Sequence, residues 1–265
     1  MIIKKYFCMC AALIILLCNF QIIESQATGS YSWYCNRNTD NLKPQLPAEF
    51  SFVEDYSVVW QNTSRQDNDS KKRAYLTFDA GYENGNVSKI LDVLKEKNVP
   101  GAFFILINLI ESNPDLVMRM EAEGHYVCNH TAHHKDMSKV VDSAVFENEL
   151  LELNDSYKKL TGKDLKKYYR PPEGRFSVSN LIEAEKLGYK TVFWSFAYAD
   201  WDNKKQPTVD YAKKKILDNI HNGCILLLHP TSSVNAEILG DVIDQMRNEG
   251  YEFGTLDDLC KEIGK

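Results

Sequence analysis

The chain has 265 residues, which is long enough to bury a full hydrophobic core in one domain. Its formal net charge is −6 and no basic stripe is present, which argues against nucleic acid as a partner. The seven cysteines form no CxxC pair, which excludes a disulfide scaffold and a zinc-finger pattern.

The N-terminus has the pattern of an export signal. Lys4 and Lys5 precede an apolar run over residues 6–20, and Ser25-Gln26-Ala27 offers a small-x-small cleavage site. We predict a signal peptide over residues 1–27, with an uncleaved membrane anchor as the alternative, because the apolar run nearly reaches membrane-spanning length. The protein is therefore expected to work outside the cytoplasmic membrane, secreted or anchored, and to contact the membrane only through this leader.

Residues 28–70 are polar and aromatic and predict an N-terminal arm or cap ahead of the main domain. Trp33, Tyr34 and Trp60 are candidate anchors for this arm. The alternative is that these aromatic side chains plug one end of the fold.

Strand-like and helix-like patterns alternate from Arg73 onward, and we assign residues 71–265 to the main domain. Apolar runs predict seven strands at residues 74–78, 101–106, 125–129, 168–170, 191–194, 224–228 and 251–253. Amphipathic helical patterns separate them. Seven such units with continuous apolar strands predict a parallel sheet covered by helices, and this number closes more naturally as a barrel than as an open sheet.

Chemically useful side chains follow five of these strands, namely Asp79, His130, Arg170, Asp200 and His229. Catalytic side chains gather at the carboxyl ends of strands in parallel barrels. Each residue alone has a structural explanation, such as a turn aspartate before glycine or a satisfied core histidine. Five of them on five strand ends favour a functional site.

The stretch His130-Thr131-Ala132-His133-His134 contains three of the six histidines. If it turns helically, His130 and His134 lie on one face, about one turn apart, which suits two imidazoles on one metal ion. The alternative is a surface histidine cluster.

Arg170 is followed by two prolines that stiffen its backbone, and its planar fork suits a carboxylate such as Asp79. His229 ends the sixth strand within reach of Asp200, which follows the fifth. Such a carboxylate would hold the imidazole protonated and oriented.

Taken together, these stretches resemble the five motifs of the polysaccharide deacetylases, carbohydrate esterase family 4, over about residues 71–258. The matching stretches are Thr77-Phe78-Asp79-Ala80-Gly81-Tyr82, His130-xxx-His134, Arg170-Pro171-Pro172, Trp194 with Asp200-Trp201, and Leu227-Leu228-His229. The resemblance is closest to the peptidoglycan N-acetylmuramic acid deacetylases of muramic δ-lactam synthesis, which modify spore cortex. The stretches Asp79–Gly85, Asn129–His134, Val192–Ser195 and His229–Glu237 carry this closer match.

The resemblance implies a distorted (β/α) barrel and hydrolysis of an N-acetyl group by a metal-bound water. By position, Asp79 is the general base that Arg170 orients, and His229 is the general acid that Asp200 tunes. His130 and His134 are the implied ligands of a divalent metal, with zinc the expected ion. Substrate contacts are expected from Tyr82, Pro171, Pro172, Trp194, Trp201 and Leu227. The implied partner is the glycan strand of peptidoglycan at the cell wall or spore cortex, and we expect a monomer.

One departure from the family pattern concerns the metal site. Most of the family has a second, metal-binding aspartate after the base, and the muramic-acid branch commonly has asparagine, whereas this chain has Ala80. Two protein ligands remain, so we expect weak metal binding or a dispensable metal. Two other functions stay open: deacetylation of N-acetylglucosamine in peptidoglycan or a chitin-like polymer, and a catalytically inactive wall-binding protein.

Overall fold

A computed structural model describes residues 29–36, 38 and 40–265. The predicted leader lies outside these residues. No helix within the described ranges is both long and apolar enough to cross a membrane.

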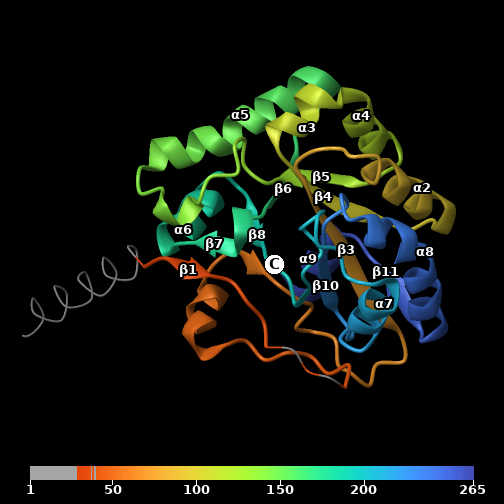
Figure 1. The fold of residues 1–265 in the computed structure, drawn as a ribbon. Helices are drawn as coiled ribbons and strands as arrows, with labels where there is room; N and C mark the ends of the chain where they lie inside the picture. Colours follow the sequence, from red (N-terminus) through yellow and green to blue (C-terminus); the bar gives the residue numbers. More distant parts are fainter. Residues whose placement is uncertain (1–28, 37, 39) are drawn as a thin grey trace, which may run out of the picture.

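In this part of the chain, nine parallel strands form one sheet (Figure 1). The strands are β2 (Val58–Val59), β3 (Lys72–Ala80), β4 (Gly101–Ile105), β5 (Tyr126–Asn129), β6 (Lys166–Tyr169), β8 (Lys190–Val192), β9 (Phe196–Ala197), β10 (Cys224–Leu228) and β11 (Tyr251–Phe253). Their order is β2-β8-β6-β5-β4-β3-β10-β9, and β11 pairs with the start of β3. β8 and β9 follow each other in the chain but lie near opposite ends of this order. The segment 190–197 therefore links the two ends of the sheet, which curves into a barrel.

The distorted barrel predicted from the sequence is therefore confirmed, and each of the seven predicted strands is present. One boundary differs in a way that concerns the site. The first predicted strand ended at Phe78, but β3 continues through Asp79 and Ala80 because they pair with Phe104 and Ile105 of β4.

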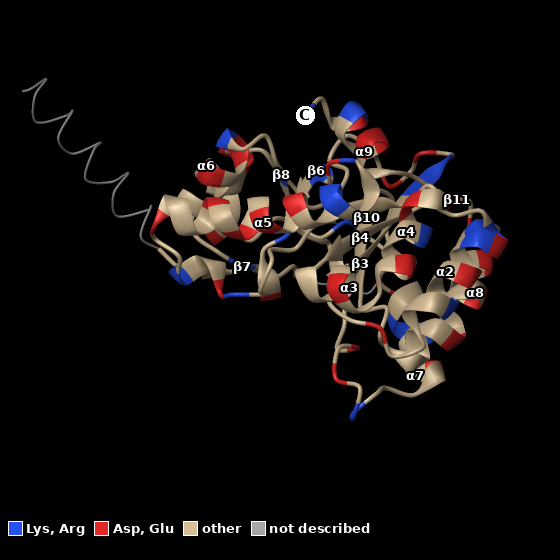
Figure 2. Cartoon of the chain, turned by 90° about the horizontal axis from the view of Figure 1, so that it is seen from above, with Lys and Arg blue, Asp and Glu red and all other residues tan. Residues whose placement is uncertain are grey.

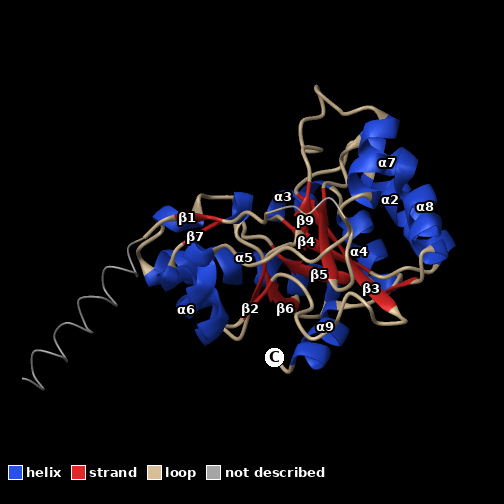
Figure 3. Ribbon diagram, turned by 90° about the horizontal axis from the view of Figure 1, so that it is seen from below, coloured by secondary structure: helices blue, strands red, loops and turns tan. Residues whose placement is uncertain are grey.

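Helices wrap the outside of the sheet (Figures 1 and 3). They are α2 (Val87–Lys97), α3 (Ile107–Ser112), α4 (Pro114–Ala122), α5 (Ser143–Thr161), α6 (Val178–Lys186), α7 (Val209–Leu217), α8 (Ser233–Asn248) and α9 (Leu256–Ile263). α8 packs against both α2 and α7, while α5 packs against α3, α4 and α6. The short α3 was not predicted, because six residues are too few to show a helical period.

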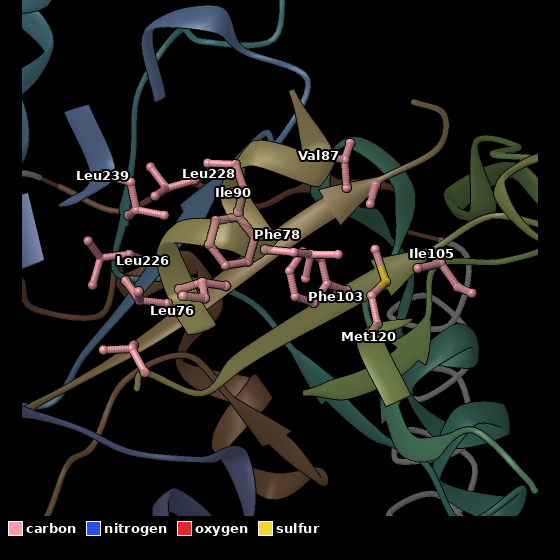
Figure 4. Close-up of a cluster of buried hydrophobic side chains, with 14 of the residues drawn as sticks. Leu76, Phe78, Val87, Ile90, Phe103, Ile105, Met120, Leu226, Leu228 and Leu239 are labelled. Carbon is pink, nitrogen blue, oxygen red and sulfur yellow. The ribbon is translucent and has the colours of Figure 1, made fainter. Parts of the chain in front are cut away.

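Alternate residues of each strand face two different cores, as the two-residue period of a strand requires. Leu76, Phe78, Phe103, Leu226 and Leu228 belong to the large core between sheet and helices (Figure 4). The intervening residues form a smaller core that contains Tyr75, Phe104, Cys128, Tyr168, Val192 and Ile225, together with Leu256 and Leu259 of α9. This smaller core is the filled interior of the barrel.

The N-terminal arm is built into the fold. It contributes β2 to the main sheet and β1 (Tyr31–Ser32), which pairs with β7 (Arg175–Phe176). Trp33 and Trp60 are buried in an aromatic cluster, where Trp33 stacks on Phe193 with ring centroids 4.4 Å apart. Tyr34 is 42% exposed, and its ring lies against Phe50 of the same arm with centroids 5.3 Å apart.

Charged side chains of both signs are interspersed over the outer helices (Figure 2). Opposite charges pair between helices, for example Arg119 of α4 with Asp92 of α2 and Lys213 of α7 with Asp241 of α8. These pairs are on the surface, where each contributes little to stability.

Candidate functional site

Every second residue of a strand points into the barrel interior. Continuing this alternation to the carboxyl ends of the strands places the predicted site residues at one end of the barrel. Tyr75 is followed at two-residue steps by Thr77 and Asp79, and Ile225 by Leu227 and His229. Because β3 and β10 are parallel neighbours with Phe78 opposite Leu228, Asp79 and His229 follow these residues at the same level of the barrel. His130 and Arg170 come two positions after the interior residues Cys128 and Tyr168.

Arg170 is fully buried, and all three nitrogens of its guanidinium group make hydrogen bonds, one of them to Asp79. Nη1 donates to Asp79 Oδ1 at 2.8 Å, and Nη2 donates to Thr77 Oγ1 at 2.9 Å. Nε donates to the carbonyl of Val192 at 3.0 Å. The guanidinium also lies over the Phe104 ring, 4.1 Å from its centroid. The predicted contact between Arg170 and Asp79 is thus present, and the cation cannot turn away from the carboxylate.

Asp79 is 10% exposed at its side chain, and its electrostatic surroundings favour the ionised form. Burial raises its pKa, but the neighbouring basic groups His130, Arg170 and His229, of which the Arg170 guanidinium is always charged, outweigh burial and hold the pKa below its ordinary value. Asp79 is therefore a carboxylate at neutral pH, able to accept a proton.

His130 is buried, and its protonation follows from its contacts. Its Nδ1 lies 2.8 Å from the carbonyl oxygen of Arg170, so Nδ1 carries the hydrogen and Nε2 the lone pair. Burial lowers the pKa of His130 to about 4, although Asp79 acts in the opposite direction. The neutral Nε2 faces Asp79 Oδ2 at 3.5 Å, which places two electron-pair donors opposite each other.

The segment from His130 to His134 is a loop, so the condition of a helical turn, under which the two histidines would share one face, is not met. Thr131 and His134 have positive φ angles of 71° and 56°, a rare conformation for non-glycine residues. The loop is held by buried Glu149 of α5, whose backbone carbonyl accepts from Ala132 N and whose side chain accepts from His133 N. The two rings nevertheless meet, with centroids 5.2 Å apart.

The donors at this place suit a divalent cation but form an incomplete set. The Nδ1–H of His130 is bound by a carbonyl and its Nε2 is free, the usual arrangement of a metal-binding histidine. Catalytic zinc sites have three protein ligands. Ala80 is fully buried and has no donor atom. Within the described residues, no group of three or more His, Cys, Asp or Glu side chains is arranged to hold a metal ion.

His229 and Asp200 form the second pair of the site. His229 Nδ1 lies 2.7 Å from Asp200 Oδ1, and the backbone N–H of His229 donates to Oδ2 at 2.8 Å. Burial lowers the pKa of His229, but the hydrogen bond and negative charge of Asp200, with that of Asp79, outweigh it and raise the pKa above its ordinary value. His229 can therefore be protonated at neutral pH beside an ionised Asp79.

The predicted substrate residues differ in exposure. Tyr82 and Trp201 are 45% and 60% exposed, and the Trp201 ring lies 6.1 Å from that of His229. Trp194 is partly buried against Gly174, where a Cβ would approach its ring to 2.7 Å. Pro171, Pro172 and Leu227 are buried and support the walls of the site.

Sequence reasoning missed two residues that bind the predicted ones. Thr77 accepts from Arg170 and donates to the carbonyl of Leu226 at 2.6 Å. Asn235 donates to Asp200 at 2.6 Å and accepts from Tyr198. Thr77 and Asn235 both lie within the stretches that resemble known motifs, which is the one signal that could have marked them.

Comparison with known proteins identifies the family. A family model described as polysaccharide deacetylase matches residues 66–192. The chain is 38% identical over 261 residues to the peptidoglycan-N-acetylmuramic acid deacetylase PdaA of Bacillus subtilis, covering 97% of each chain. This chain belongs to the polysaccharide deacetylase family. It is therefore a hydrolase.

Two solved structures and one further sequence relative show the spread of this family. The solved structure of B. subtilis PdaA, a family 4 carbohydrate esterase, superposes with a TM-score of 0.83 over 89% of this chain and 98% of that chain. A peptidoglycan-N-acetylglucosamine deacetylase of Bacillus cereus is 32% identical over 78% of this chain and 73% of its own length. A family pseudoenzyme from Bacillus anthracis is 25% identical, with a TM-score of 0.69 over 77% of this chain and 69% of that chain.

Proposed function

We propose that this polysaccharide deacetylase removes the N-acetyl group of N-acetylmuramic acid in peptidoglycan, outside the cytoplasmic membrane. The observation that carries the proposal is the match to B. subtilis PdaA over 97% of both chains. Hydrolysis consumes one water and yields acetate and a free amine at carbon 2 of the sugar. That amine can condense with the lactyl carboxylate of the same sugar, which leads to the muramic δ-lactam of spore cortex.

The proton transfers are assigned to the two pairs of the site. Asp79, held by Arg170, takes a proton from the attacking water, and the water oxygen bonds to the acetamide carbon. His229, held by Asp200, gives its proton to the departing nitrogen as the carbon–nitrogen bond breaks. The two groups come from adjacent strands, so they can act on a substrate placed between them.

His130 and His134 are the residues that would hold a divalent cation such as Zn²⁺. When bound, the cation supplies polarisation of the amide carbonyl and a lower pKa for water. Because the position of a third ligand is Ala80, we propose that this chain binds the cation weakly. The low pKa of Asp79 makes it a weak base on its own, so acidification of the water would be useful here.

Two alternatives have specific support. The similarity to the B. cereus enzyme favours N-acetylglucosamine as the second candidate for the sugar. Ala80 and the similarity to the B. anthracis pseudoenzyme favour a wall-binding protein without activity. The four paired residues Asp79, Arg170, Asp200 and His229 argue against lost activity, because wall binding has no need for a base and an acid.

The test uses the purified protein from residue 28 onward and peptidoglycan stripped of its stem peptides. Muropeptide analysis, with chelator and then with added Zn²⁺, separates the candidates. Muramic amine or muramic lactam supports the proposal, glucosamine favours the second sugar, and no released acetate favours a wall-binding protein. Activity that disappears with chelator and returns with Zn²⁺ supports the cation, whereas unaffected activity contradicts it.

A further inference from the structure

The carboxylate of Asp200 carries one more hydrogen bond than its pairing with His229 requires. Oδ1 faces His229 Nδ1 at 2.7 Å, while Oδ2 accepts from His229 N at 2.8 Å and from Asn235 Nδ2 at 2.6 Å. Asp200 and Asn235 are each 1% exposed. Because both side chains are buried, bulk water does not compete for the hydrogen bond from Asn235 to Asp200.

The amide of Asn235 can donate to Asp200 in only one of its two orientations, and a third residue selects that orientation. The hydroxyl of buried Tyr198 donates to Asn235 Oδ1, which leaves Nδ2 for Asp200. Burial, with the charge of Asp200, raises the pKa of Tyr198, so its hydroxyl stays a donor. Nδ2 also donates to the carbonyl of His229 at 3.1 Å.

The position of Asn235 is fixed from its own helix as well. It lies in the first turn of α8, where its backbone N–H donates to Ser232 Oγ, the helix N-cap, at 3.1 Å. The backbone N–H, the amide oxygen and the amide nitrogen of Asn235 are thus all hydrogen-bonded. These bonds keep the amide in one place beside the carboxylate of Asp200.

We propose that Asn235 is a positioning residue for the general acid: its amide, oriented by Tyr198, fixes the carboxylate of Asp200 and through it the ring of His229. Asn235 contacts the carboxylate of Asp200 and the backbone carbonyl of His229, not the His229 ring. A buried carboxylate held by several donors keeps one direction. Without the amide, only the backbone N–H of His229 would hold Oδ2, and Oδ1 could turn away from Nδ1. This inference rests on the proposed role of His229 as the acid.

Three charged groups on the elements around His229 act on its ring. They are Asp200 after β9, Asp79 on β3 and Arg170 after β6. Asp200 and Asp79 stabilise the protonated ring, whereas Arg170 opposes it. Loosening Asp200 therefore removes the larger favourable contribution and leaves burial and Arg170 to disfavour the charge.

The primary test is an NMR titration of the His229 ring in the free protein, which needs no substrate. In Asn235→Leu we expect the pKa of His229 to fall by about one unit, because the hydrogen bond from Asp200 is weakened. Tyr198→Phe removes only one hydroxyl and keeps the packing, so a smaller fall in the same direction is expected, and this variant serves if Asn235→Leu does not fold. An unchanged His229 pKa in folded Asn235→Leu or Tyr198→Phe overturns the proposal.

The second readout is kinetic, on soluble glycan fragments of peptidoglycan. We expect kcat of Asn235→Leu to fall at least about tenfold, within the range that a general acid contributes, with KM changed less than about twofold. The decrease of kcat at high pH should move to lower pH. A rise of KM of about tenfold with kcat unchanged contradicts a positioning role.

Asn154 offers a matched control. It is a buried asparagine on α5 whose Nδ2 donates to Asp164 at 2.9 Å, away from the site. Asn154→Leu should lower the melting temperature without changing the His229 titration. If wild-type protein releases no acetate at all, the proposed function fails, and the titration still decides the role of Asn235.

Discussion

Arg170 and Asp79 are 91 positions apart in the sequence and form a buried ion pair, with Nη1 2.8 Å from Oδ1. The arginine side chain is 0% exposed and the aspartate side chain 10% exposed. A buried pair of this kind contributes little net stability, but loss of one partner leaves the other charge buried and unpaired. The pair therefore fixes the base in place rather than strengthening the barrel.

The first prediction concerns the role of Asp79. Asp79→Asn keeps the shape and a partner for Arg170 but removes the group that accepts a proton. We expect deacetylation to fall at least about a hundredfold while the protein still folds, with a lower melting temperature because buried Arg170 loses its counter-charge. Acetate release and thermal unfolding are the measurements, and near-native turnover would show that another group is the base.

The second prediction concerns Arg170. Arg170→Met leaves Asp79 buried without its cation, which we expect to cost about 3–5 kcal/mol in the free energy of unfolding. Denaturant unfolding measures it, with Arg175→Met as the control, because Arg175 is 43% exposed at its side chain and pairs with Asp136 at the surface. Equal losses in the two variants would contradict the importance of burial.

The third prediction tests the gap at Ala80. An aspartate here would be buried among apolar neighbours, so Ala80→Asp should unfold at a lower temperature in chelator. Added Zn²⁺ should restore the melting temperature and bind more tightly than to wild type, as followed by calorimetric titration. If Zn²⁺ binds both proteins equally, position 80 does not face the two histidines.

The fourth prediction concerns pH. Because the pKa of His229 is raised above its ordinary value, the acid stays protonated to a higher pH than a free histidine and is lost as pH rises through this raised pKa. We expect kcat to be maintained at pH 7 and to decline at higher pH. In His229→Gln the remaining activity should be low and should show no such decline.

The fifth prediction concerns the exposed aromatic rim. Trp201 is 60% exposed beside His229 and offers a face on which a sugar ring can stack. Trp201→Ala should raise KM by about twofold to tenfold with a smaller effect on kcat. Tyr211→Ala is the control, since Tyr211 is 55% exposed on the outer helix α7. The rim is not a substrate contact if both variants behave alike.

The strand pattern made much of this architecture predictable. Period and composition locate the apolar strands, and the parallel arrangement brings residues such as Asp79, Arg170 and His229 to one end. The conformation of the loops between the strands was less predictable from the sequence. Thr131 has a positive φ in a loop whose next two residues, Ala132 and His133, are held by Glu149 of a later helix, and no local pattern announces such a contact.

Partner residues were the least predictable part. Asn235 occupies the first turn of α8, three residues after the N-cap Ser232, where nothing in the local sequence marks it as a partner of the site. Only the packing of α8 against the end of β10 shows that its amide meets Asp200. Buried polar contacts between distant segments depend on the completed fold, and a single sequence does not record them.

The register of two neighbouring strands has a consequence for how this enzyme can diversify. Phe78 stands opposite Leu228, so the spacing of base and acid is set by backbone pairing deep in the barrel. Loops that carry Tyr82 or Trp201 are free of that constraint. Insertions and exchanges in these loops can change which polymer is accepted while the distance over which protons are passed stays constant. New substrate ranges should therefore arise by loop variation on an unaltered pair of strands.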